Sequence, residues 1–303
     1  MKLTNQEFEQ YDDALNESLK EGDFQNIMKY SKLLLQHLQS FPQPDYNGIS
    51  ILLDYIGYAN IQLGKLQEGL EHYMEALDIR KKFFPSDRQR IATLYNDIGE
   101  TYDRMHNCDD ALKYYKIALE IREEVFQHEH LDVALSYNNI GAVLMDMQRY
   151  DEALKYHTKA LEIRKKLRPP EHEDILVSQM SIGMIHNLTG KHGTALDSHM
   201  ETLTNLNDTT LKSDFNHPDE MLRLAPAMTN EIIAATCFKE GRYDEALKHL
   251  QDALAIKKEV LPENHPDIAS TYEYISSVYR NLGMPEEAMH YMELSIKIQS
   301  ENE

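Results

Sequence analysis

Three stretches of the sequence are variants of one pattern: GKLQEGLEHYMEALDIRKK at 64–82, HNCDDALKYYKIALEIREE at 106–124 and QRYDEALKYHTKALEIRKK at 148–166. Further copies begin at 190, 241 and 283, and a weaker one begins at 22. One small or apolar residue marks the same position in every copy: Ile27, Gly69, Ala111, Ala153, Ala195, Ala246 and Ala288. Successive copies lie 42 residues apart, except that 51 residues separate the fifth from the sixth. This regularity predicts stacked supersecondary units.

Within each unit the pattern predicts two helices. A small residue stands in an apolar stretch ahead of each clear copy, at Gly57, Gly99, Gly141, Gly183, Ala234 and Ser276. Seven residues later comes a loop position, which is glycine in four copies and His106 or Gln148 in two; glycine there suits a left-handed helix end. The next stretch places Ala76 and Ile79, and their equivalents, at helical spacing along one buried face.

These positions resemble the tetratricopeptide repeat (TPR) signature, and the 42-residue length resembles the kinesin light chain subtype. The segment YNNIG (137–141), the two copies of ALEIR and the two HPD tripeptides strengthen this resemblance, which covers about residues 48–299. It implies an all-α fold, a right-handed superhelical α-solenoid of about seven antiparallel helix-pair repeats. It also implies that the first helix of each repeat lines a concave groove.

The repeat positions predict one solenoid over residues 1–303. It begins with a degenerate N-terminal repeat at 1–45 and continues with four regular repeats at 48–206. An insertion at 207–226, rich in turn formers and ending in Pro226, precedes two C-terminal repeats at 227–303. The repeat before the insertion has histidines, His192 and His199, where its neighbours have core aromatics. We therefore expect it to be softer than its neighbours and to loosen first in acid.

Composition excludes several function classes. The chain has 51 acidic residues against 31 Lys and Arg, a net charge of −20, which argues against binding nucleic acid or anionic membranes. No apolar run approaches the length of a membrane span, so we expect no membrane insertion. Two cysteines without a disulfide framework, and a start without the apolar core of a signal peptide, predict a cytoplasmic location.

No catalytic motif is present, so the sequence predicts neither an enzyme nor a cofactor or metal site. His157, His186, His192 and His199 cluster in two repeats, but their spacing matches no metal motif, and we interpret them as half-buried, hydrogen-bonded side chains. The tripeptides at 217–219 and 265–267 are interpreted as helix starts. Cys108 and Cys237 are interpreted as small buried groups.

The resemblance places a partner on four positions of each first helix: three residues before the small residue, and one, four and five after it. We expect the groove to comprise Asp54, Tyr58, Asn96, Glu100, Asp103, Arg104, Asn138, Met145, Asp146, Met184, Asn187, Glu231, Phe238, Lys239, Glu273 and Arg280. Asn96 and Asn138 can hydrogen-bond to an extended peptide backbone. Acidic side chains dominate the N-terminal half, which favours a basic or apolar partner segment.

The sequence therefore predicts a non-catalytic scaffold that binds a protein or peptide segment in its groove. The alternative is a self-associating or peptide-responsive assembly or regulatory module, including cargo-adaptor use like that of kinesin light chain repeats. The final helix, expected at 286–300, has Met292 and Ile296 at positions that face the core in the other repeats. If these side chains are exposed, a homo-oligomer through this helix is possible.

Overall fold

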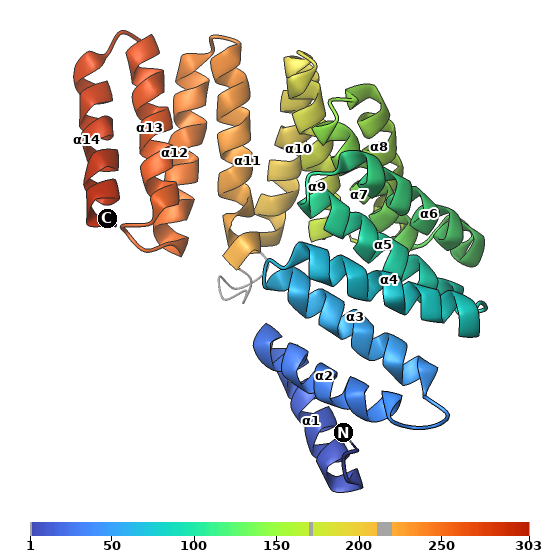
Figure 1. Cartoon of the computed structure of the whole chain (residues 1–303). Helices are drawn as coiled ribbons and strands as arrows, with labels where there is room; N and C mark the ends of the chain where they lie inside the picture. The colour runs from blue at the N-terminus through green and yellow to red at the C-terminus, as the bar shows by residue number, and fades with distance from the viewer. Residues whose placement is uncertain (1, 170–171, 211–219, 303) are drawn as a thin grey trace. The chain divides into compact units, whose positions relative to one another are not determined.

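The computed structural model describes residues 2–169, 172–210 and 220–302. In these ranges the chain forms fourteen α-helices and no strand, as seven successive pairs, and the predicted all-α helix-pair fold is confirmed (Figure 1). The helices are α1 (Asn5–Glu21), α2 (Phe24–Gln39), α3 (Tyr46–Gln62), α4 (Leu66–Phe83), α5 (Arg88–Arg104), α6 (Cys108–Phe126), α7 (Leu131–Asp146), α8 (Tyr150–Leu167), α9 (Glu173–Leu188), α10 (His192–Thr210), α11 (Glu220–Lys239), α12 (Tyr243–Val260), α13 (Pro266–Asn281) and α14 (Pro285–Glu301).

The helices divide into two compact units, Met1–Tyr156 and His157–Glu303, with the boundary inside α8. In the first unit the helices from α1 to α7 pack in sequence order, α1 on α2 and so on up to α6 on α7. In the second unit the same holds from α9 to α14. Each unit therefore grows by contacts between sequence neighbours, as expected for a repeat array.

Helix ends follow the sequence signals. The side chains of Asp23, Asp45, Asp87 and Asn107 cap helices by accepting a backbone N–H of the first turn. His265 does the same for the backbone N–H of Asp267, and Pro266 opens α13, so this HPD tripeptide is a helix start as predicted. His217 lies outside the described residues. The loop position has positive φ in glycine and also in His106 and Gln148, both at 58°.

In two repeats the glycine of the first helix makes room for a tyrosine side chain of the second helix. A Cβ built on Gly57 would lie 2.7 Å from the ring of Tyr73, and one on Gly99 would lie 2.8 Å from the ring of Tyr115. Real Cβ atoms do not approach other atoms so closely, so these positions require glycine. The same slot is filled by His199 beneath Gly183.

A buried cation near the end of α6, α8 and α12 ties each of these second helices to the first helix of the next repeat. Arg122, Arg164 and Lys257 are at most 5 % exposed. Each donates to a hydroxyl 14 residues later and to a backbone carbonyl 10 residues later: Ser136 and Asp132, Ser178 and Asp174, and Thr271 and Asp267. These charge-assisted bonds hold the repeat register, a role that the sequence pattern ALEIR alone did not reveal.

The segment 207–226 is more helical than expected. Helix α10 continues through Thr210 and α11 begins at Glu220, so Pro226 lies inside α11 rather than before it. One turn after the proline, Asn230 Nδ2 donates to the Pro226 carbonyl oxygen at 3.0 Å. Residues 211–219 lie outside the described residues.

Candidate functional site

The first unit contains a pocket of about 310 Å³, here called the N-terminal pocket. Helix α3 contributes all four positions expected to face a partner in its repeat, and α5 contributes Glu100. Its lining is Leu19, Asp54, Tyr55, Tyr58, Ile61, Gln62, Tyr73, Asp97, Glu100 and Thr101. The sequence did not single out Asp97, although it follows Asn96 directly.

Two carboxyl groups of the N-terminal pocket, those of Asp54 and Asp97, have raised pKa values. Burial raises the pKa of Asp54 to about 6, partly offset by the charges of Arg90 and Arg80. Burial, and then the charge of Asp54, raise the pKa of Asp97 to about 7. Neither carboxylate forms an ion pair within the described residues. A cationic group in this pocket would therefore relieve their mutual repulsion.

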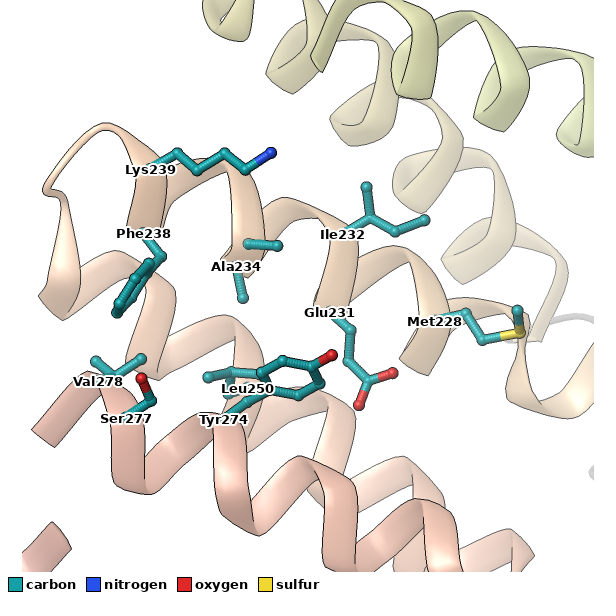
Figure 2. A pocket seen from close by; sticks show the side chains of 11 residues that line it. Met228, Glu231, Ile232, Ala234, Phe238, Lys239, Leu250, Tyr274, Ser277 and Val278 are labelled. Carbon is teal, nitrogen blue, oxygen red and sulfur yellow. The ribbon is translucent and has the colours of Figure 1, made fainter. Parts of the chain in front are cut away.

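The second unit contains a larger pocket of about 470 Å³, here called the C-terminal pocket, between α11 and α13 (Figure 2). All four positions expected to face a partner in α11 line it, and α13 contributes the equivalent residue Ser277. Its lining is Met228, Glu231, Ile232, Ala234, Ala235, Phe238, Lys239, Leu250, Tyr274, Ser277 and Val278. Most of this lining is apolar.

The two ionisable side chains of opposite charge in the C-terminal pocket differ in their partners. Glu231 Oε1 lies 2.6 Å from the buried ammonium of Lys257 and accepts a 2.7 Å hydrogen bond from Thr271 Oγ1. Lys239 is exposed and forms no ion pair in the part of the chain that the structure describes. The uncompensated charge of this pocket is therefore positive.

Asn96 is a correction to the expected groove. Its side chain is 7 % exposed, and its Oδ1 accepts hydrogen bonds from Asn139 Nδ2 at 3.0 Å and from Arg122 Nη1 at 3.4 Å. An amide so engaged is not presented to a peptide backbone. Glu231 bonds to Lys257, and Glu273 Oε1 accepts from Gln299 Nε2 at 2.7 Å. In each of these three repeats, the polar residue three positions before the small residue accepts a hydrogen bond from the residue 26 positions after it: Arg122 for Asn96, Lys257 for Glu231 and Gln299 for Glu273.

The other expected groove residues vary in exposure. Tyr58, Glu100, Arg104, Asp146, Met184, Lys239, Glu273 and Arg280 are exposed, whereas Asp54, Asp103, Asn138, Met145, Asn187, Glu231 and Phe238 are partly buried. Burial raises the pKa of Asp103, with a further contribution from Asp146. Asn187 Nδ2 donates to Thr236 Oγ1 at 2.8 Å, which joins α9 to α11. Of the expected groove residues, Asp54, Tyr58, Glu100, Glu231, Phe238 and Lys239 line the two pockets described above.

The four histidines differ from one another, and His192 alone has both the half-buried position and the hydrogen-bond contact that we expected. His199 is fully buried rather than half-buried, and neither ring nitrogen has a hydrogen-bond partner among the described residues. Burial lowers its pKa to about 4, with a further contribution from His186. His157 is also buried, and His192 Nδ1 lies 3.3 Å from Asn187 Oδ1. The described residues contain no group of His, Cys, Asp or Glu arranged to hold a metal ion.

Among the helices that the structure describes, none has the length and apolar character that crossing a membrane requires. Cys237 is buried and Cys108 partly buried, and both are free thiols.

The family model described as the tetratricopeptide repeat matches residues 22–124, 132–208 and 225–301. The chain belongs to the TPR family. A comparison with curated proteins finds no match. Among solved structures, the Podospora anserina TPR-like repeats described as a kinesin light chain share 18 % identity over 71 % of this chain and 98 % of theirs, with a TM-score of 0.60.

Two Rap structures also share the fold. The apo form of RapI has 12 % identity over 97 % of this TPR chain and 98 % of its own, with a TM-score of 0.68. A Rap protein complexed with competence and sporulation factor has 16 % identity over 97 % of this chain and 77 % of its own, with a TM-score of 0.57. At these identities the likeness shows the fold alone.

Proposed function

We propose that this TPR chain is a non-catalytic scaffold that binds a segment of a partner protein along the first helices of its repeats. The observation that carries the proposal is the recurrence of a pocket at the same repeat positions, once in each unit. A TPR array generally serves as an interaction module, and one Rap structure with the same fold holds competence and sporulation factor.

The lining of the pockets supports the chemistry expected of the partner. Asp54, Asp97 and Glu100 of the N-terminal pocket favour a basic side chain, because their charges are not neutralised by an ion pair. The C-terminal pocket favours an apolar side chain. The free cysteines are consistent with the cytoplasmic location that we propose along with this function.

Selection from a phage-displayed random peptide library tests the proposal. Selected peptides should lose about tenfold or more in affinity when a pocket is blocked by Ala235→Arg or reversed in charge by Glu100→Lys. The matched controls are Ala255→Arg and Glu75→Lys, which are exposed on second helices of the same units. The proposal fails if folded protein carrying both pocket changes binds the selected peptides as tightly as the unaltered chain.

A second candidate function, self-association through α14, is favoured by one observation. Met289 and Ile296 are 61 % and 55 % exposed, whereas the equivalent Leu112 and Leu119 in α6 are 7 % and 8 % exposed. Met292 is only partly exposed. Light scattering should then show dimers of the unaltered chain and monomers of Ile296→Glu. Monomers of the unaltered chain at all concentrations would exclude this function.

A further inference from the structure

We propose that the C-terminal pocket recognises a large apolar side chain with an acidic residue beside it, and that Lys239 receives the carboxylate. This inference rests on the proposed scaffold function and names the ligand chemistry of one of its sites. The expected ligand is a peptide segment with an apolar and an acidic side chain, because the pocket lining is apolar and its unpaired charge is positive.

The shape of the pocket requires an apolar occupant. Ala234 leaves space along α11 between the larger side chains of Phe238 and Met228, and Tyr274 and Val278 of α13 form the opposite wall (Figure 2). Ala235, another small residue of α11, also lines the pocket. Met228 and Tyr274 are 41 % and 59 % exposed, so part of this apolar surface meets water when the pocket is empty. A cavity of about 470 Å³ has room for a leucine or phenylalanine side chain, whose burial is strongly favourable.

Charge selects the residue next to that side chain. The carboxylate of Glu231 is already neutralised by Lys257, which is 5 % exposed and bonds to Thr271 as well. Lys239 is the remaining charged residue of the lining, and it has no ion-pair partner among the residues described. A carboxylate of the partner gains from this ammonium, whereas a basic group is repelled by it.

The N-terminal pocket provides an internal control. Its charged lining residues are Asp54, Asp97 and Glu100, so an acidic element is repelled there. The same acidic and apolar peptide should therefore bind in the second unit and leave the first unit unperturbed. This contrast separates recognition by the C-terminal pocket from nonspecific adhesion to apolar surface.

Four synthetic peptides test the inference. All four have a Gly-Ser background. Three have a central leucine, which is flanked on both sides by Asp, by Ser or by Lys. The fourth has a central serine flanked on both sides by Asp. They are titrated into the full chain carrying ¹³C-methyl methionine, with the Met228 signal assigned through Met228→Leu. We expect the Asp-flanked leucine peptide to shift Met228 with a Kd about threefold lower than the Ser-flanked peptide and about tenfold lower than the Lys-flanked peptide. The serine peptide should bind at least about tenfold more weakly.

Charge reversal provides the decisive comparison. Lys239→Glu should invert the preference between Asp and Lys flanks and keep the requirement for leucine. The matched control Lys248→Glu makes the same change in net charge on an exposed residue outside the pocket, and it should keep the original preference. Thermal unfolding shows whether the variants are folded. If Lys239→Glu does not fold, Lys239→Gln replaces it, and this variant should abolish the preference between Asp and Lys flanks.

Three results would overturn the inference: equal affinity for Asp and Lys flanks, an unchanged preference in both Lys239 variants, or no shift of Met228 with any peptide. If library-selected peptides still bind and depend on Glu100 alone, the scaffold function stands and only this inference fails. If the selected peptides bind independently of both pockets, the proposed function itself fails.

Discussion

Acid should destabilise the fifth repeat, α9 and α10, through His199. This side chain is 0 % exposed and lies against Gly183, in the slot that Tyr73 and Tyr115 fill in other repeats. Burial, and then the proximity of His186, lower its pKa from 6.5 to about 4. The folded state therefore resists protonation that the unfolded chain accepts, and stability falls as the pH drops from about 6.5 towards 4.

The magnitude follows from the two pKa values. At about 1.4 kcal/mol for each unit of difference between the two pKa values, complete protonation of His199 costs about 3 kcal/mol. At pH 5 the unfolded histidine is almost fully charged and the folded one mostly neutral, so the loss is about 2 kcal/mol relative to pH 8. His186, whose pKa burial also lowers, adds a loss of the same sign.

Hydrogen exchange by mass spectrometry at pH 7.5 and pH 5, corrected for intrinsic exchange, localises the effect. A repeat array can open locally, so peptides from 173–206 should lose more protection in acid than peptides from 92–146. His199→Tyr restores the aromatic residue of the other repeats and should remove about 2 kcal/mol of the acid sensitivity. The control is His290→Tyr on α14, because His290 is exposed.

Equal acid sensitivity in His199→Tyr and the unaltered chain would refute this reasoning. So would equal loss of protection in 173–206 and 92–146. Either result would mean that His199 is solvated or hydrogen-bonded in a way that leaves its pKa near the unfolded value.

Two further changes test the packing of the first unit. Gly99→Ala should destabilise it by about 1–3 kcal/mol in urea unfolding, because the new Cβ meets the Tyr115 ring. If the ring is the cause, the same change should lower the free energy of unfolding by less in a Tyr115→Leu background. Arg122→Met should cost about 1–3 kcal/mol, because Ser136 Oγ loses its donor in a buried site. An unchanged urea midpoint in either single variant would contradict the corresponding contact.

The repeat architecture was predictable because the same local sequence signals occur in successive repeats. Small residues such as Gly57 and loop glycines such as Gly64 recur at fixed offsets, and the capping residues Asp45 and Asp87 lie one repeat apart. Each of these signals has a local physical cause. The course of 207–226 was less predictable. We expected this insertion, rich in turn formers, to end at Pro226 before the next repeat, but α11 starts at Glu220 and contains Pro226.

The positions expected to face a partner include residues that line the C-terminal pocket, but the sequence did not predict the electrostatic state of that pocket. Family offsets placed Glu231 and Lys239 on one pocket, yet they could not show that Glu231 is neutralised and Lys239 is not. That difference depends on Lys257, which lies 26 residues after Glu231 and is brought to it by the packing of α12 on α11. A single sequence gives no distance between two such side chains.

The buried guanidinium of Arg122 also explains why Asn96 does not have the peptide-binding role that we expected. Asn96 belongs to a network with Arg122 and Asn139, so its polar atoms stabilise the stacking of repeats. A partner that competed for Asn96 would leave a buried guanidinium short of an acceptor, at a cost comparable to the hydrogen bond that it gained. Recognition is therefore better served by side chains at the pocket rims, such as Lys239 and Glu100, whose charges have no ion-pair partner among the described residues.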